Sequence, residues 1–298
     1  MSLKALANKI QSMTNMQKIT SSMKMVAAAK MKGTETRKKA GAVFGDRISK
    51  AAFPQPFFTP EELEDDATLP LIMESEQNTF LTICSDRGLC GGVNTQAAKT
   101  TRLAIEKLEA EGKSVEINVF GEKARATLER NMADKLVCTM DEVWQEVPSF
   151  AMASCATTRA LTNNPDRVHL VYNKFKSAIA YQPTIFNMEN YYKFNETALE
   201  SGSDVIYPEH LAEYEFEPEN STESLQNMFE FSMAGSVFMG MIEGQASEES
   251  SRMAAMDNAS KNATEIVEKL QLKYNRARQA AITTELIEII SGAAALEG

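Results

Sequence analysis

The stretch Ser85–Asn94 (SDRGLCGGVN) is the first place in this chain where residue types and spacing could do chemistry. It follows an expected strand and precedes an expected helix, which is where α/β folds place a phosphate-binding loop. It lacks the Gly-Lys-Ser/Thr ending of a P-loop, and it lacks the G-x-G-x-x-G pattern of a dinucleotide site. A tight glycine-rich turn, in which Asp86 or Arg87 makes a local polar contact, therefore explains the stretch better than nucleotide binding does.

Cys84 and Cys90 border or occupy this stretch, and a cysteine nucleophile needs a neighbouring base. The chain has only two histidines. His169 falls in an alternating strand, where a satisfied core or edge role is the commoner one, and His210 falls in an expected loop. The four cysteines form no C-x-x-C pair. Two acidic clusters, Glu61–Asp66 and Glu213–Glu219, lack the spacing of a calcium loop. We therefore expect no metal site, no cofactor and no catalytic residue.

The elements that would position these residues form a small α/β segment. Strands are expected at Thr79–Cys84, Ser114–Phe120, Lys135–Met140, Arg167–Phe175 and Pro183–Met188, and helices at Asn94–Glu111, Gly121–Arg130 and Pro148–Asn163. Strands that alternate with helices predict a mostly parallel sheet that is covered on both faces. The last two strands are joined by a link too short for a crossover helix, which predicts an antiparallel hairpin at one edge of the sheet.

A first long helix is expected over residues 1–52, before Pro54 and Pro56 end it. Its apolar residues recur at steps of three and four, the spacing of one helix face. They are Leu3, Leu6, Ile10, Met13, Met16, Ile19, Met23 and Val26. Three successive steps of three, between Ile10 and Ile19, depart from a heptad repeat and predict that the supercoil is locally overwound.

A second long helix is expected over residues 219–298, because Pro218 is the last of the nine prolines and helix interiors exclude proline. This helix would be roughly 115 Å long. Its end carries no Lys or Arg from Ala280 onward and places apolar residues on more than one face, namely Leu286, Ile287, Ile289 and Ile290. A helix that is apolar nearly all round is buried all round, so this tip requires protein from beyond this chain.

These elements predict an α/β fold in which an antiparallel coiled coil of long N- and C-terminal helices flanks a small Rossmann-like α/β domain. No middle segment supplies two further long helices for a bundle, so each long helix is the obvious mate of the other. Four segments are expected: an N-terminal coiled-coil helix (1–52), an acidic, proline-containing connection (53–78), the α/β domain with the loop region that follows it (79–218) and a C-terminal coiled-coil helix (219–298).

The net charge of −10 hides an asymmetry between the ends of the chain. Residues 1–50 carry eleven Lys or Arg against Glu35 and Asp46, a balance of +9 that leaves −19 for the remainder. A basic helix on an acidic body predicts an acidic partner surface for that helix. Nucleic acid is disfavoured as this partner, because the isoelectric point is about 5.0 and no aromatic residues are interleaved with the basic ones.

Four stretches resemble the gamma subunit of F-type ATP synthase, in the same order and over essentially the whole chain. They are QKITSSMKMVAAAKM (Gln17–Met31), SDRGLCGGVN, NKFKS (Asn173–Ser177) and the block that begins SRMAAMDNASKNATEIVEKLQ at Ser251. Their wording is most similar to mitochondrial members. The resemblance implies a non-catalytic, rotating central shaft, which couples rotation of the membrane c ring to ATP synthesis or hydrolysis in an alpha/beta hexamer.

The resemblance also implies partners and contact residues. The partners would be the alpha/beta hexamer, the delta and epsilon central-stalk subunits and the c ring, at the matrix side of the mitochondrial inner membrane. Contact with beta subunits is implied for Met23, Lys24, Arg252, Arg278, Gln279 and Thr283, and Arg252 is also implied in rotor stability. Leu286, Ile287, Ile289 and Ile290 would form a bearing tip, and Tyr214, Phe216, Glu217 and Pro218 would form a foot on the c ring and the epsilon-type subunit.

Two other functions stay open at this point. One is a nucleotide-binding α/β enzyme with helical arms, which the missing phosphate motif disfavours. The other is a static coiled-coil scaffold, which would tolerate a covalent link to its partner, whereas a rotor would be stopped by one.

Overall fold

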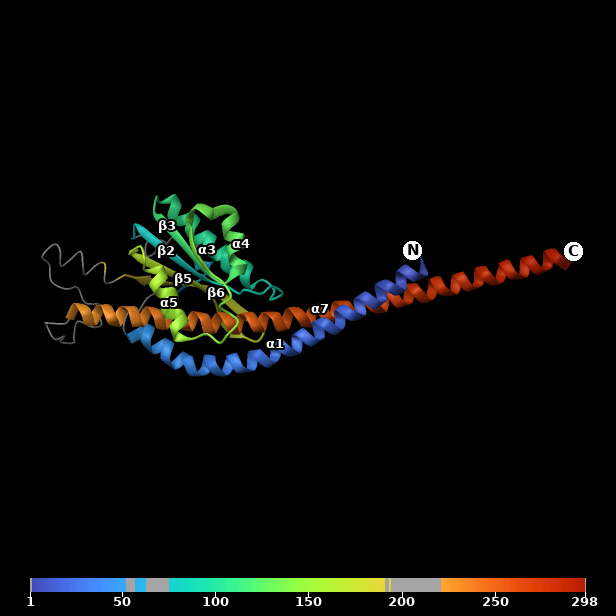
Figure 1. The fold of residues 1–298 in the computed structure, drawn as a ribbon, viewed down its shortest axis with the longest axis horizontal. Helices are drawn as coiled ribbons and strands as arrows, with labels where there is room; N and C mark the ends of the chain where they lie inside the picture. The colour runs from blue at the N-terminus through green and yellow to red at the C-terminus, as the bar shows by residue number, and fades with distance from the viewer. Residues whose placement is uncertain (1, 52–56, 63–74, 191–192, 194–220, 298) are drawn as a thin grey trace. The chain divides into compact units, whose positions relative to one another are not determined.

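The computed structural model describes residues 2–51, 57–62, 75–190, 193 and 221–297. The chain divides into two compact units, one of Met1–Ala28 with Met253–Gly298 and one of Ala29–Arg252. The two long helices are α1 (Leu3–Ala51) and α7 (Ser221–Glu297), and each contributes to both units (Figure 1). The units therefore differ from the segments expected from the sequence. Among the helices described, none is both long and apolar enough to cross a membrane.

The smaller unit is an antiparallel pair of helices. Gln17 donates a hydrogen bond to Thr264 at 2.8 Å, and Lys24 donates one to Asp257 at 2.7 Å. An advance of seven residues along α1 is thus matched by a return of seven residues along α7, which is the relation expected of antiparallel helices in a heptad repeat. The predicted antiparallel coiled coil is confirmed.

The buried side of α1 in this unit matches the predicted stripe only in part. Buried and half-buried positions alternate at unbroken steps of three and four, through Leu3, Leu6, Ile10, Met13, Gln17, Thr20, Lys24 and Ala27. Met16, Ile19 and Val26 are instead 51%, 56% and 55% exposed. The predicted stripe is wrong at these three residues. The predicted overwinding depended on steps of three that include Met16 and Ile19, so it loses its basis. Gln17, Thr20 and Lys24 occupy the buried stripe instead. Their polar side chains form hydrogen bonds with residues of α7 or with a carbonyl of α1 itself.

The facing stripe of α7 follows the same alternation. Its buried and half-buried residues are Met253, Met256, Ser260, Ala263, Val267, Leu270, Tyr274, Ala277 and Ala281. From residue 282 to 293, every described side chain is exposed. The heptad seam between the two helices therefore ends near Ala281, while α7 continues to Glu297.

The larger unit contains a six-stranded sheet with the order β1-β6-β5-β2-β3-β4. The strands are β1 (Phe57–Phe58), β2 (Gln77–Ile83), β3 (Ser114–Phe120), β4 (Leu136–Met140), β5 (Arg167–Ser177) and β6 (Ala180–Glu189). β2 lies parallel to β3 and β5, and β3 lies parallel to β4. β5 and β6 form the predicted antiparallel hairpin.

The edge of the sheet differs from the prediction, because β1 pairs with β6 in antiparallel fashion and takes the edge position. β1 lies in the stretch 53–78, which was expected to be only a connection. The ring of Phe57 stacks on that of Phe186, with 4.5 Å between the ring centroids, and Phe58 is buried. An aromatic cross-strand pair of this kind stabilises a sheet edge, which explains how two residues suffice for a strand.

Helices cover both faces of the sheet, as predicted (Figure 1). α3 (Val93–Ala110) and α4 (Glu122–Met132) pack on one face, and α5 (Phe150–Ala160) and the first half of α7 pack on the other. A short 3-10 helix, η2 (Ala133–Lys135), follows α4. Consecutive strand residues serve opposite layers, as Phe80 and Leu81 do, so β2 is buried almost continuously instead of alternating between buried and exposed residues.

Candidate functional site

Ser85 and Asn94, at the two ends of the loop Ser85–Asn94, form hydrogen bonds within the loop. The hydroxyl of Ser85 donates to the carbonyl of Arg87 at 2.6 Å, and Asn94 Oδ1 accepts from the backbone N–H of Ser85 at 2.9 Å. Gly91 has a φ of 63°, and a Cβ there would lie 2.7 Å from the hydroxyl oxygen of Ser251. Only glycine meets both the conformation and the crowding. The interpretation as a tight glycine-rich turn is confirmed.

Asp86 is the polar contact of this turn. Its carboxylate accepts from the backbone N–H of Glu122 at 3.0 Å, at the start of α4, and from the backbone N–H of Trp144 at 3.1 Å. Amide groups at a helix start lack partners within the helix, and a carboxylate satisfies them favourably. Asp86 therefore joins the loop after β2 to the loops after β3 and β4, and its oxygens serve the fold.

Cys84, Cys90 and His169 are not prepared for nucleophilic catalysis. Burial raises the pKa of Cys84 to about 12 and also raises the pKa of Cys90. His169 is buried, stacks on Phe80 and bonds with its two ring nitrogens to Asn187 and Asn78. Burial lowers its pKa to about 3, so His169 is a neutral core residue, as predicted.

His210 lies outside the described residues. Within the described ranges, no group of three His, Cys, Asp or Glu residues is arranged to hold a metal ion.

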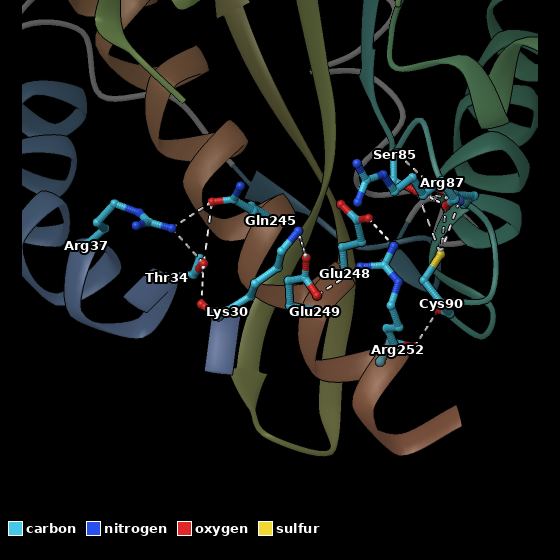
Figure 2. Close-up of polar contacts among 12 residues, drawn as sticks. Lys30, Thr34, Arg37, Ser85, Arg87, Cys90, Gln245, Glu248, Glu249 and Arg252 are labelled. Atoms are coloured by element: carbon cyan, nitrogen blue, oxygen red, sulfur yellow. Dashed lines mark hydrogen bonds and ion pairs between the residues drawn. The ribbon is translucent and has the colours of Figure 1, made fainter. Parts of the chain in front are cut away.

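A buried charged cluster lies on α7 where it leaves the sheet (Figure 2). Arg252 pairs with Glu248 and, at 2.9 Å, with Glu249, and all three side chains are at most 10% exposed. Glu249 also lies 3.9 Å from the amine of Lys30 on α1. Burial raises the pKa of Glu248, and Arg252 opposes that effect. For Arg252, burial lowers the pKa, but the two carboxylates outweigh it and the pKa is raised.

Two turns further along α1, a second polar contact joins the same pair of helices within the larger unit (Figure 2). Arg37 donates to the hydroxyl of Thr34 at 3.0 Å and to the side-chain carbonyl of Gln245 at 3.3 Å. The sequence pattern does not mark these residues as a cluster. The spacing of Glu248 and Arg252 by four residues is a visible sign of a helix ion pair, but its burial depends on α1, which is distant in the sequence.

Lys24 and Arg252, expected from the resemblance to contact a beta subunit, have partners within this chain. Arg252 lies in the charged cluster just described. Lys24 pairs with Asp257, which in turn pairs with Lys261 at 2.7 Å. Met23, beside Lys24, is half-buried.

Arg278, Gln279 and Thr283 lie on one exposed stretch of α7. The hydroxyl of Thr283 donates to the carbonyl of Gln279 in its own helix at 2.9 Å, so this threonine is held by local structure. Arg278 lies 21 residues beyond Asp257, the partner of Lys24, which is roughly 30 Å along the helix. The structure therefore brings three of the six expected residues together and separates them from Met23 and Lys24.

The predicted apolar tip is exposed in this chain. Leu286, Ile287, Ile289 and Ile290 are between 53% and 70% exposed. Large apolar side chains clustered on a free surface mark a site where protein or membrane is bound. The foot residues Tyr214, Phe216, Glu217 and Pro218 lie outside the described residues.

Comparison with known proteins gives consistent similarities. A family model described as ATP synthase matches residues 2–296. The chain is 36% identical to the ATP synthase F(1) complex subunit gamma, mitochondrial, of Rattus norvegicus, over 99% of both chains. A chain in the OSCP/F1/c-ring structure of Euglena gracilis mitochondrial ATP synthase has a TM-score of 0.78 at 24% identity, with 99% of this chain and 94% of that one covered. A chain in the central stalk/c-ring structure of Tetrahymena thermophila mitochondrial ATP synthase has a TM-score of 0.61 at 28% identity, with 81% and 99% covered.

Proposed function

This chain belongs to the ATP synthase gamma family, and from that premise we propose that it is the rotating central shaft of a proton-driven ATP synthase. The shaft couples rotation of a c ring to ATP synthesis or hydrolysis in an alpha/beta hexamer and has no catalytic residue of its own. The observation that carries the proposal is the end of α7, where apolar side chains extend past the last heptad contact with α1. Such an end needs a protein sleeve, and a hexamer that encloses a shaft provides one.

The proposed partners follow from the family and from the assemblies of its relatives. They are the alpha/beta hexamer, the delta and epsilon central-stalk subunits and the c ring. The Tetrahymena structure is described as central stalk and c ring, which supports the c ring as a partner. The rat relative is described as mitochondrial, which supports a mitochondrial location. We propose in addition that the protein is peripheral, on the matrix side of the inner membrane.

The roles of individual residues are part of the same proposal. Leu286, Ile287, Ile289 and Ile290 form the bearing surface inside the sleeve. Arg278, Gln279 and Thr283, which are exposed just before the tip, engage the beta subunits, and Met23 lies at a second, separate level. Arg252 acts within the shaft, as a brace between α7 and α1. Tyr214, Phe216, Glu217 and Pro218 form the foot that meets the c ring and the epsilon-type subunit.

Purification tests the assembly. The tagged full-length chain should bring down three alpha and three beta subunits with ATPase activity. Recovery of the chain alone, or with partners that lack ATPase chains, would contradict the proposal. A nucleotide-binding enzyme would instead retain activity without such partners.

A reversible covalent link distinguishes a rotor from a static scaffold. Gln279 is exposed, so a cysteine placed there by Gln279→Cys should form a disulfide with a cysteine introduced on the facing beta subunit. ATP turnover should stop on oxidation and return on reduction, because a linked shaft cannot turn. The complex with Gln279→Cys alone, oxidised in the same way, is the control. Full turnover in the linked complex would establish a scaffold instead.

A further inference from the structure

One face of α7 packs on the sheet of the larger unit and changes character along its length. Its residues recur at steps of four and three: Met233, Val237, Gly240, Gly244, Ser247 and Ser251. The first two belong to the apolar core. A Cβ on Gly240 would lie 3.2 Å from both Ile83 and Leu170, so the helix approaches the sheet closely there. The face then ends in hydroxyl groups.

Three serines at that end, Ser247, Ser250 and Ser251, form a set that we call the serine row. Each donates its hydroxyl to a backbone carbonyl of the α/β body, by which we mean residues 75–190. The acceptors are the carbonyls of Asn173 in β5, Ala178 in the β5–β6 hairpin and Cys90 in the loop after β2, at 2.8, 2.6 and 2.6 Å. One turn of helix is thus tied to three separate parts of the body.

These hydroxyls act differently from other hydroxyls on the long helices. Ser236, which is also buried on α7, donates to the carbonyl of Ser232 in its own helix at 2.9 Å, as helix serines commonly do. The serine row donates across the interface instead. α1 contacts the same hairpin. Lys38 donates a hydrogen bond to the carbonyl of Phe175 at 3.0 Å, and its amine lies over the Phe175 ring.

We propose that the serine row is the joint that transmits torque between the α/β body and α7. This inference rests on the proposed function, since only a rotating chain carries torque. Apolar contacts are non-directional, so they oppose rotation of a helix about its own axis only through the shapes of the packed side chains. Hydrogen bonds weaken steeply when their angle or length changes, so three of them around one turn resist that rotation.

The torsional stiffness of the assembled complex tests this role. A probe is attached to the α/β body at the exposed Cys155, the hexamer is fixed to a surface, and the shaft is stalled with a non-hydrolysable ATP analogue. In the triple variant Ser247→Ala, Ser250→Ala and Ser251→Ala, the angular variance of the stalled probe should rise about twofold, because three directional contacts are lost. Ser236→Ala is the matched control, since it removes a buried serine hydroxyl of the same helix without removing a contact to the body.

Each outcome decides the question. If the angular variance of the triple variant equals that of Ser236→Ala, the serine row does not transmit torque and the proposal is wrong. If the triple variant does not assemble, Ser250→Ala alone should raise the variance by a smaller amount, and no rise overturns the inference equally. An unmodified complex that never rotates under ATP would refute the proposed function instead, so the two failures are separable.

Discussion

Lys24 of α1 and Asp257 of α7 form an ion pair of 2.7 Å at a heptad position of the helix seam. The hydrogen bond from Lys24, followed by that from Lys261, lowers the pKa of Asp257 from 3.8 to about 2. The ionised carboxylate therefore supports the helix pair fully above about pH 4, and this support is lost as the pH falls through about 2. A residue expected to contact another subunit thus has a partner 233 positions away in its own chain.

Replacing Lys24 by Met should raise the pKa of Asp257 toward 3.8, because the first of its two cationic partners is gone. The measurement is an NMR titration of aspartate carboxyl carbons in the labelled chain. Lys18→Met, which changes an exposed lysine of the same helix, should leave the titration of Asp257 unchanged. An unaltered pKa in Lys24→Met would show that the pair does not persist in solution.

The corrected stripe of α1 predicts unequal effects of two leucine-sized truncations. Leu6 is 5% exposed and Ile19 is 56% exposed. Leu6→Ala should destabilise the start of α1 by about 2 kcal/mol, the lower end for a buried leucine. Ile19→Ala should cost less than about 0.5 kcal/mol in the isolated chain. Amide hydrogen exchange of α1 measures both values, and a larger loss at Ile19 would restore the stripe that the apolar pattern predicted.

His169 predicts a pH dependence of the larger unit. Its pKa is about 3 when folded and 6.5 when unfolded, so below pH 6.5 only the unfolded chain binds the proton. The free energy of unfolding should therefore fall as the pH is lowered from about 6.5 toward 3, by at most about 1.4 kcal/mol per pH unit from this group.

Urea denaturation at pH 7, 6, 5 and 4 measures this slope. His169→Gln should flatten it, and His210→Gln, which changes the other histidine of the chain, should retain it. Equal slopes in the two variants would assign the pH dependence to other groups.

The charged cluster predicts a large cost for removing its cation. Arg252→Met leaves Glu248 and Glu249 buried without the guanidinium that pairs with both, which should cost about 3–5 kcal/mol of unfolding free energy. Lys30→Met is the comparison, because Lys30 is 49% exposed and its loss should cost less than about 1 kcal/mol. Denaturant unfolding near pH 7 separates the two values. Similar small losses would mean that water reaches the cluster.

The proposed engagement of the beta subunits predicts an effect on turnover without an effect on folding. Arg278→Ala with Gln279→Ala should lower ATP turnover of the assembled complex, because both side chains are exposed in the last turn of the seam and free to contact a partner. The double variant should assemble normally, since neither side chain is buried in this chain. Lys273→Ala, an exposed lysine on the same helix, is the control. Unchanged turnover in a correctly assembled double variant would remove these residues from the contact.

Local features of the sequence were enough to predict the main elements. The absence of proline after Pro218 predicted α7, and strand-like runs such as Ser114–Phe120 predicted the parallel sheet within one or two residues at most ends. The apolar residues after Ala280 predicted an end that this chain does not bury. These features depend on the chemistry of neighbouring residues, which is why reading along the chain detects them.

The tertiary structure decided which partners those elements meet. Gln17, Thr20 and Lys24 replace apolar neighbours in the seam because their partners lie on α7 or in the preceding turn of α1. The burial of Arg252 and the joint at the serine row depend likewise on contacts with distant segments. Hydropathy ranks a residue by its own transfer from water, whereas a polar group is buried cheaply only when a partner satisfies it. For Gln17 and Lys24 that partner lies on α7, more than 200 residues away in the sequence, so a local pattern does not identify it.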